Sequence, residues 1–241
     1  MKIKWGVIGC GGIADRRTIP GMMLAENAEL IAVMDVDKEA AERTAKKYGA
    51  KYSFGNADEL LALDEIQAVY IASPVFCHRE QCIAAARAKK HILIEKPVGL
   101  TVEEAKELSD ICDKEGVKLG VGFMMRFHAY HQKMHELIAD GKLGEIVSAR
   151  AQLTCWYPQM DNCWRQDKKL SGGGAMMDMG IHCIDLIRYI TGLEVKAVTG
   201  MTGNQIFKYN AEDAGAAVFR LENGALCYVD ANFNIPDEAV K

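Results

Sequence analysis

A short apolar segment runs directly into a glycine-rich turn at the start of the chain, in IKWGVIGCGGIADRR. Gly9, Gly11 and Ala14 match the pattern G-x-G-x-x-G/A. In that pattern the first glycine permits a tight turn, the second lets backbone amides approach a pyrophosphate, and the last small residue lets a helix pack close to a strand. Phosphates bind at such a helix N-terminus because its N–H groups are unpaired and the helix dipole favours anions. The segment therefore predicts a strand, a phosphate-binding turn and a helix.

An aspartate ends the next apolar run, LIAVMD, and supports the same interpretation. Asp35 follows Ala14 by 21 residues (35 − 14), close to the spacing of about 20 for the carboxylate that accepts from a ribose 2′-hydroxyl. A carboxylate there repels a 2′-phosphate, so NAD is favoured over NADP. Together the turn and the aspartate predict a dinucleotide site.

Strand-like and helix-like segments alternate up to about Gly122, which is typical of parallel βαβ units. The strands are expected in IKWGVI, ELIAVMD, KYSF, AVYIAS, HILIEKP and VKLGVGF, and the helices near residues 12–25, 38–48, 57–62, 79–90 and 102–115. We therefore expect residues 1–122 to form a doubly wound α/β Rossmann domain. Ligands bind at the carboxyl ends of the strands in such sheets. Those ends are Gly9 to Gly12, Asp35, Ser73 and Pro74, and Glu95 to Pro97.

The pattern changes after Gly122. A polar helix is expected in HAYHQKMHELIADGKLG, and a long alternating strand in EIVSARAQLTCWY. A glycine-rich turn and a helix follow, and then three strand-like runs, VKAVTGMTG, AGAAVFRLE and ALCYVDANFN. The hairpin sequence Glu222-Asn223-Gly224 favours antiparallel pairing. Residues 123–241 are thus expected to form an α+β domain with an open, largely antiparallel sheet.

Composition and charge exclude several classes of partner. The 241 residues are 49% hydrophobic and 26% charged, with a net charge of −4 and no basic block. Nucleic acid and anionic membranes are therefore not expected partners. Glycines and then Asp15, Arg16 and Arg17 interrupt the apolar amino end, so neither a signal peptide nor a spanning helix is expected, and the cytoplasm is the expected compartment. The eight cysteines are scattered without a C-x-x-C pair, which is typical of reduced, mostly buried side chains.

Three residues are candidates for chemistry. Lys96 follows a strand end in ILIEKP, where its ammonium could stabilise charge on a substrate oxygen. Asp178 and His182 are four residues apart on an expected helix and so share a face. Histidine titrates nearest the working pH and suits the base that takes a hydroxyl proton. Each has a plainer alternative: a surface lysine before a proline, a capping aspartate and a packed histidine.

Three histidines on another expected helix raise the question of a metal. His128, His131 and His135 lie along one face, a spacing compatible with zinc. No H-E-x-x-H motif accompanies them, and Tyr130, Met134, Leu137 and Ile138 suggest that a neighbouring face turns inward. A solvated flank is the better interpretation, and no metal site is expected.

The chain resembles the Gfo/Idh/MocA oxidoreductases, the family of glucose-fructose oxidoreductase and inositol 2-dehydrogenase. The resemblance runs nearly end to end, through GVIGCGGIA, ASPVFCH, KHILIEKP, GFMMRF, DGKLGEI and WRQDKKLSGGGAMMDMGIHCIDLIRYITG. It implies that Lys96, Asp178 and His182 form the catalytic group, with His182 as proton acceptor. It also implies a cis Lys96–Pro97 peptide and cofactor contacts from Gly9, Gly11, Gly12, Ile13, Asp35, Ser73, Pro74, His78, Glu95, Lys96, Trp164 and Arg165. For His78 a helix N-cap is an equal alternative, and for Trp164 and Arg165 so is loop packing.

The resemblance implies an NAD-dependent dehydrogenase that acts on a sugar, polyol or inositol-type hydroxyl. Two alternatives remain open: a redox-neutral, NAD-dependent glycoside-modifying enzyme of the same family, and a non-catalytic NAD-binding sensor. Family members usually pair through the second sheet, so a homodimer or homotetramer is expected. They also continue with further strands after the equivalent of NFNIPDEAVK, so the second domain is expected to be incomplete.

Overall fold

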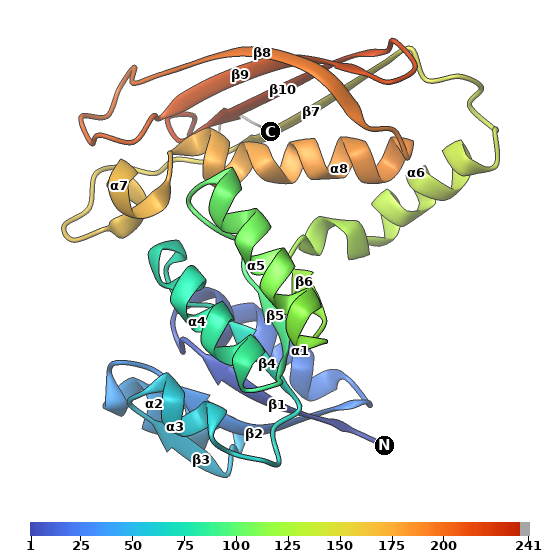
Figure 1. Ribbon diagram of the computed structural model, residues 1–241. Coiled ribbons are helices and arrows are strands. Elements are labelled where there is room, and N and C mark those ends of the chain that lie inside the picture. The colour runs from blue at the N-terminus through green and yellow to red at the C-terminus, as the bar shows by residue number, and fades with distance from the viewer. Residues whose placement is uncertain (237–241) are drawn as a thin grey trace. The chain divides into compact units, whose positions relative to one another are not determined.

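The computed structural model describes residues 1–236. The chain forms two compact units, Met1–Gly122 and Phe123–Lys241. Figure 1 shows the helices and strands of each unit along the chain.

The first unit is built on a sheet of six parallel strands, which confirms the predicted Rossmann fold. In chain order the strands are β1 (Ile3–Ile8), β2 (Ala28–Met34), β3 (Tyr52–Phe54), β4 (Ala68–Ile71), β5 (His91–Ile94) and β6 (Leu119–Val121). Their order across the sheet is β3-β2-β1-β4-β5-β6. The direction of winding reverses between β1 and β4, and ligands bind beside such a reversal in open parallel sheets.

Three helices of this unit begin where a side chain accepts hydrogen bonds from their first turn, and two of the three end at a glycine. The helices of the unit are η1 (Ala14–Thr18), a π-helical turn that continues into α1 (Ile19–Leu24), and then α2 (Lys38–Tyr48), α3 (Ala57–Leu61), α4 (Val75–Arg87) and α5 (Val102–Glu115). Asp37, Asn56 and Thr101 accept hydrogen bonds from the first turns of α2, α3 and α5. Gly49 and Gly116 end α2 and α5 in the left-handed conformation, with φ of 73° and 71°.

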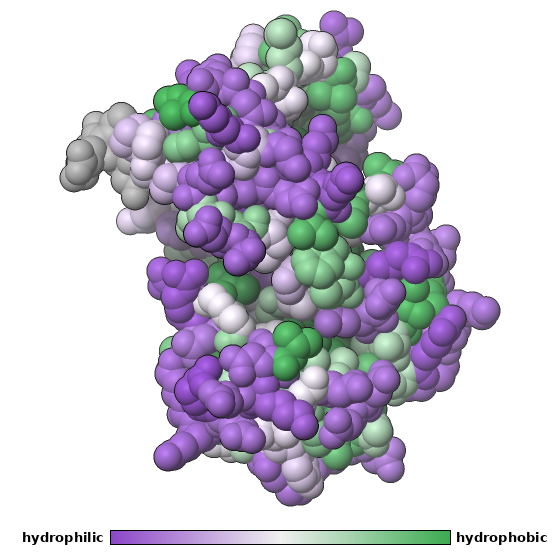
Figure 2. Space-filling view, turned by 90° about the vertical axis from the view of Figure 1, so that its left-hand side faces the viewer, coloured by the Kyte–Doolittle hydropathy of each residue, from purple (hydrophilic) through white to green (hydrophobic). Residues whose placement is uncertain are grey.

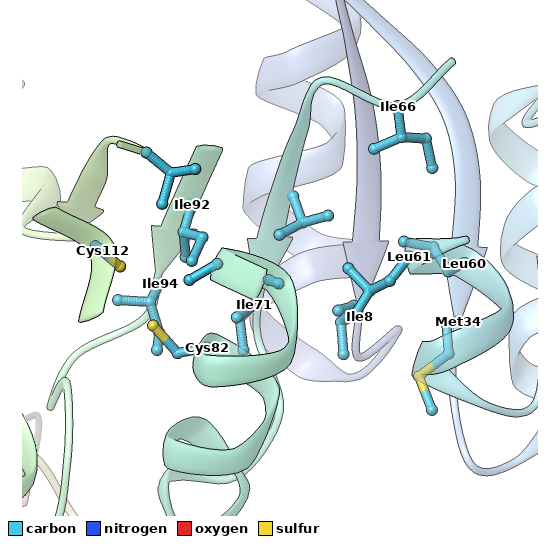
Figure 3. Packing of buried hydrophobic residues seen from close by; sticks show 14 of the residues in the cluster. Ile8, Met34, Leu60, Leu61, Ile66, Ile71, Cys82, Ile92, Ile94 and Cys112 are labelled. Atoms are coloured by element: carbon cyan, nitrogen blue, oxygen red, sulfur yellow. The ribbon is translucent and has the colours of Figure 1, made fainter. Parts of the chain in front are cut away.

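Both faces of the six-stranded sheet are buried. On one face, side chains of α3, α4 and α5 pack on β1, β4 and β5, and Figure 3 shows Ile8, Ile71 and Ile94 at the centre of this cluster. On the other face, Ala14 and Ile19 and residues of α2 pack on Val7 and Val33. Near-continuous apolar strands such as AVYI are explained by this burial, because a parallel sheet has no solvent-facing side.

The second unit has a four-stranded sheet with helices packed on one face. Its elements are η2 (Met124–Phe127), α6 (Ala129–Ala139), β7 (Ser148–Thr154), η3 (Trp164–Gln166), α7 (Lys168–Ser171), η4 (Met176–Gly180), α8 (Ile181–Thr191), β8 (Val195–Gly203), β9 (Ala214–Leu221) and β10 (Leu226–Asn232). The strand order is β7-β10-β9-β8. The pairs β8–β9 and β9–β10 are antiparallel, whereas β10 pairs with β7 in parallel. The sheet is thus largely antiparallel, as predicted, with one parallel pair.

Helix α8 covers the buried face of this sheet. Cys183 and Ile187 of the helix pack on Phe219, Cys227 and Val229. Alternate residues of β9 point to this core and to the opposite, exposed face. In contrast, the expected inward face of α6 is wrong in part, because Tyr130 and Met134 are 76% and 47% exposed.

Hydropathy, helix length and the state of the cysteines complete the description of residues 1–236. Figure 2 shows a face on which hydrophilic side chains predominate and hydrophobic ones are interspersed among them. Within residues 1–236 no helix is long and apolar enough to cross a membrane. The eight cysteines, all in the described part of the chain, are free thiols, and five of them are buried: Cys10, Cys82, Cys112, Cys183 and Cys227.

Candidate functional site

The glycine turn after β1 is shaped by close contact with the end of β4. Gly9 has φ of 95°, and a Cβ atom there would lie 2.8 Å from the backbone nitrogen of Ser73. No other side chain fits this position, for conformational and for steric reasons. At Gly11 a Cβ atom would have no neighbour within 4 Å, so the backbone is open on that side. The turn therefore has the tight first residue and the accessible second residue that a phosphate-binding loop needs.

Asp35 is hydrogen-bonded to the same turn. Its carboxylate accepts from the backbone N–H of Cys10 at 2.8 Å and from that of Asp37 at 3.0 Å. A carboxylate can accept about four hydrogen bonds, which leaves capacity for a ribose diol. Burial raises the pKa of the neighbouring Cys10 thiol to about 12, so this side chain stays protonated beside the carboxylate. Asp35 thus fixes the turn in addition to the ribose role expected from the sequence.

The ends of β4 and β5 carry the next candidates. Ser73 and Pro74 directly precede α4, and the Ser73 hydroxyl donates to Oε1 of Gln81 at 2.5 Å. Glu95 directly follows β5, and its carboxylate accepts from the Tyr70 hydroxyl at 2.5 Å. Burial, and then the Glu95 charge, raise the pKa of Tyr70, which keeps this hydroxyl a donor.

Lys96 and His78 lie next to these groups in the chain and in the fold. Lys96 follows Glu95, and the Lys96–Pro97 peptide is cis, which confirms that prediction. His78 lies in the first turn of α4, whose N-cap is Pro74, so the N-cap alternative for His78 is wrong. Its side chain is only 1% exposed, and both ring nitrogens face backbone carbonyl oxygens. This geometry favours a supporting role for His78 over a direct cofactor contact.

In the second unit, the glycine-rich turn places η4 directly on the segment before β9. A Cβ atom at Gly174 would lie 1.8 Å from the carbonyl oxygen of Glu212. The same carbonyl accepts from the Ala175 N–H at 2.9 Å, and Oε1 of Glu212 accepts from the Met176 N–H at 3.3 Å. Glycine at position 174 is therefore needed for close backbone approach at the start of the helix that carries Asp178 and His182.

Asp178 belongs to η4, a π-helical segment that continues into α8, where His182 is the second residue. Such wide turns are rare in proteins overall, and many of those that occur lie at functional sites. Nε of Arg165 lies 4.0 Å from the Asp178 carboxylate, and its guanidinium stacks over the Trp164 ring at 4.4 Å. The His182 ring is 6% exposed and meets Phe123 edge-on, with 6.1 Å between centroids. The second unit thus brings Trp164, Arg165 and Asp178 together, with His182 one turn further along.

One pair of charged residues beside this helix was not predicted from the sequence. Arg126 of η2 donates to both oxygens of Asp185, at 2.8 and 2.5 Å, and stacks over the Tyr189 ring. Asp185 is 4% exposed. Asp185 follows His182 by three residues and so lies on the same side of the helix. This spacing is the sequence signal from which Asp185 could have been identified as a neighbour of the candidate base.

The histidines of α6 have other partners. His128 caps α6 by accepting from the Tyr130 N–H, the His131 ring contacts the Met125 carbonyl, and His135 stacks on Tyr189. Among the described residues, no group of three or more potential ligands could hold a metal ion.

Comparisons with known proteins agree with this architecture. Residues 3–123 match the model of the Gfo/Idh/MocA oxidoreductase family with its NAD-binding Rossmann fold, and residues 131–240 match a Gfo/Idh/MocA C-terminal domain. The 1,5-anhydro-D-fructose reductase of Ensifer adhaerens is 31% identical over 226 residues, which are 92% of this chain and 67% of that protein. The glucose-6-phosphate 3-dehydrogenase of Bacillus subtilis is 36% identical over 192 residues, which are 78% of this chain and 53% of that protein.

A solved structure of an oxidoreductase has the same fold. The aldose-aldose oxidoreductase of Caulobacter crescentus superposes with a TM-score of 0.91 and 27% identity, over 98% of this chain and 72% of that one. This chain therefore spans about half to three quarters of the length of these relatives. With both of its units matched, the chain belongs to the Gfo/Idh/MocA family of oxidoreductases.

Proposed function

We propose that this chain is the cofactor-binding and catalytic part of an NAD-dependent dehydrogenase that oxidises a secondary hydroxyl of a sugar, polyol or inositol-type compound. The observation that carries the proposal is the glycine turn with Asp35 hydrogen-bonded to it, in a chain that also has Lys96, Asp178 and His182 at the family's motif positions. Relatives of the chain are named as sugar dehydrogenases and reductases.

In this proposal the first unit binds the nucleotide. Amides of Gly11, Gly12 and Ile13 take the pyrophosphate, and Asp35 takes the ribose diol. Solved relatives are described in complex with NAD and with NADP, so the preference for NAD rests on the Asp35 carboxylate, which would repel a 2′-phosphate. Ser73, Pro74 and Glu95 lie at neighbouring strand ends and would line the nicotinamide side. His78 would support the backbone of these segments and would not contact the cofactor itself.

The remaining residues would handle the substrate hydroxyl. The nicotinamide ring, when bound, supplies the hydride acceptor. His182, supported by Asp178, takes the hydroxyl proton, and the Lys96 ammonium stabilises negative charge that develops on the substrate oxygen. Trp164 and Arg165 would contact the cofactor from the segment before α7, where Arg165 also faces Asp178. The second unit would bind substrate and mediate pairing into a homodimer or homotetramer. The expected location of the protein is the cytoplasm.

A panel of aldoses, polyols and inositols tests the proposal, with NAD or NADP as oxidant and reduced nucleotide formation as the signal. We expect net NADH formation with at least one member, and a lower rate with NADP. Product formation without net NADH would instead indicate the redox-neutral enzyme. Tight NAD binding without turnover of any compound would indicate a sensor.

A further inference from the structure

His78 is a buried histidine with a backbone carbonyl at each ring nitrogen. Nδ1 lies 2.9 Å from the Pro97 carbonyl oxygen, and Nε2 lies 3.0 Å from the Ser73 carbonyl oxygen. A neutral imidazole donates from one nitrogen, and an imidazolium donates from both. Burial lowers the pKa of His78 against the opposing effect of the carbonyls of Ser73, Pro97 and Val98. The buried ring therefore lies between the Pro97 and Ser73 carbonyls, and in its neutral form it donates to one of them.

The two carbonyls belong to the segments that follow β4 and β5. The pairing of the two strands ends with Ile71 opposite Ile94, and the Glu95 N–H makes one more bond to the Ile71 carbonyl at 2.9 Å. Beyond that point no sheet hydrogen bond among the described residues joins Ser73 to Pro97. The His78 ring lies between the two segments where the strand pairing ends.

Lys96 lies between two fixed neighbours as a result. Before it, the Glu95 carboxylate accepts from Tyr70, whose oxygen in turn accepts from the Thr18 hydroxyl at 3.0 Å. A Cβ atom at Gly122 would lie 3.2 Å from Oε1 of Glu95, so this carboxylate is also closely packed. After Lys96, the Pro97 carbonyl meets the His78 ring. The first anchor acts on a side chain and the second acts on the backbone.

We propose that His78 is a positioning residue for Lys96: protonated at Nδ1, it donates to the Pro97 carbonyl and fixes the backbone from which the Lys96 ammonium extends. The inference rests on the proposed role of Lys96 at the substrate hydroxyl. A displacement of about 1 Å at a reacting group can lower a rate by about 100-fold. A residue that touches neither cofactor nor substrate can therefore control turnover through this carbonyl.

Two conservative substitutions separate the two contacts of the ring. His78→Asn places its amide nitrogen near the position of Nδ1 and retains a donor for Pro97, whereas His78→Gln places it near Nε2 and retains a donor for Ser73. His78→Leu removes both ring nitrogens and so leaves no donor for either carbonyl. Cys82→Ala is the matched control, because Cys82 lies one turn further along α4, is 0% exposed and contacts neither segment through a hydrogen bond.

Turnover and cofactor affinity are the first readouts. We expect His78→Gln and His78→Leu to lower kcat by about 10- to 100-fold, and His78→Asn to stay within about threefold of the wild type. The Kd of NAD, from calorimetry, should change by less than about threefold in all three variants, since His78 is assigned no cofactor contact. Cys82→Ala should lower Tm through its cavity and leave kcat unchanged. Wild-type kcat in the Gln and Leu variants, or an Asn variant as slow as the Leu variant, would overturn the proposal.

Hydrogen exchange of the backbone amides of Glu95, Lys96, Val98 and Gly99 is a readout that needs no activity. We expect faster exchange there in the Leu and Gln variants, wild-type exchange in the Asn variant, and no change in this segment with Cys82→Ala. If the wild type oxidises no compound of the panel, the proposed function fails, and exchange alone decides whether His78 holds this segment. Unchanged exchange in the Leu variant would show that it does not.

Discussion

At the scale of single residues, Asp35 makes structural hydrogen bonds besides the ribose contact that we propose for it. Spacing predicts a ribose-binding carboxylate, and the structure adds hydrogen bonds to the amides of Cys10 and Asp37. The carboxylate therefore holds the phosphate-binding turn in shape before any nucleotide arrives. Changing it should affect nucleotide affinity through both ribose and turn.

Asp35→Asn should weaken NAD binding by about 10- to 100-fold, because a hydrogen bond to a charged group contributes about 1.5–3 kcal/mol and an amide nitrogen cannot accept. The preference for NAD over NADP should fall as the repelling charge is lost. Calorimetry with both nucleotides measures each effect. Asn56→Ala, which removes only the N-cap of α3, is the control and should leave both affinities unchanged. An Asp35→Asn variant with wild-type affinity would show that Asp35 is not part of the nucleotide-binding site.

His182→Ala should lower kcat by about 10²- to 10⁴-fold, the range for a lost general base, with the Kd of NAD nearly constant. His135→Ala is a suitable control, since His135 packs on Tyr189 and is assigned no chemical role. Near-normal turnover in the His182 variant would mean that another group takes the proton, and Lys96 would become the first candidate.

At the scale of elements, close backbone approach explains a motif that composition alone describes only as glycine-rich. Gly174→Ala would place a methyl group 1.8 Å from the Glu212 carbonyl, so η4 or the Glu212 segment must move. We expect the free energy of unfolding of the second unit to fall by about 3 kcal/mol or more, a size typical of severe overpacking. Urea unfolding measures it. Gly203→Ala, with no atom within 4 Å of the added methyl, should change stability by less than about 1 kcal/mol. Equal effects of the two substitutions would contradict the steric explanation.

Asp213 organises the loop before β9 and gives a prediction with a defined pH dependence. Its buried carboxylate accepts from the N–H groups of Gln205, Ile206 and Phe207 and from Asn234. Burial alone would raise the pKa of Asp213, but these donors bring it below its ordinary value. The folded pKa is therefore the lower one, so the stabilisation is complete above about pH 4 and is lost as the pH falls further.

Asp213→Asn should accordingly lower the free energy of unfolding by about 2 kcal/mol or more at pH 7, because an amide nitrogen leaves buried donors unpaired. The difference from the wild type should shrink below about pH 4. Urea titrations at several pH values test this. A difference that stays constant down to pH 3 would show that the ionised carboxylate is not what stabilises the loop.

The sequence predicted the elements well where the signal is local. Gly9, Asp35 and Lys96 lie within short motifs with fixed spacing, and the alternation of segments identified the doubly wound sheet. Contacts between distant residues left no such signal. The Arg126–Asp185 pair joins residues 59 apart, and the Tyr70–Glu95 bond joins residues 25 apart. The parallel pairing of β7 with β10 was missed for the same reason, since hairpin turns specify only adjacent strands.

At the scale of the whole molecule, the second sheet has one face that its own helices do not cover. Val218 and Tyr228 are paired across β9 and β10 on this face and are 37% and 44% exposed, and Met201 of β8 is 83% exposed. Apolar residues thus lie on the exposed face of three strands, beside the Arg150–Asp230 ion pair that borders Tyr228. A two-fold axis would let this surface pair with itself in a second copy, in the manner expected for the family.

Replacing Val218 and Tyr228 together by glutamate should therefore shift the protein toward the monomer, because like charges would face each other across the two-fold axis. Light scattering over a concentration series measures the mass. Val102→Glu changes an apolar residue of the first unit that is 64% exposed and should leave the mass unchanged. Thermal unfolding of the double variant in dilute solution should match that of the wild type under the same conditions, since both would then be monomeric. A wild type that is monomeric at every concentration, or a double variant that keeps the oligomeric mass, would exclude this face as the interface.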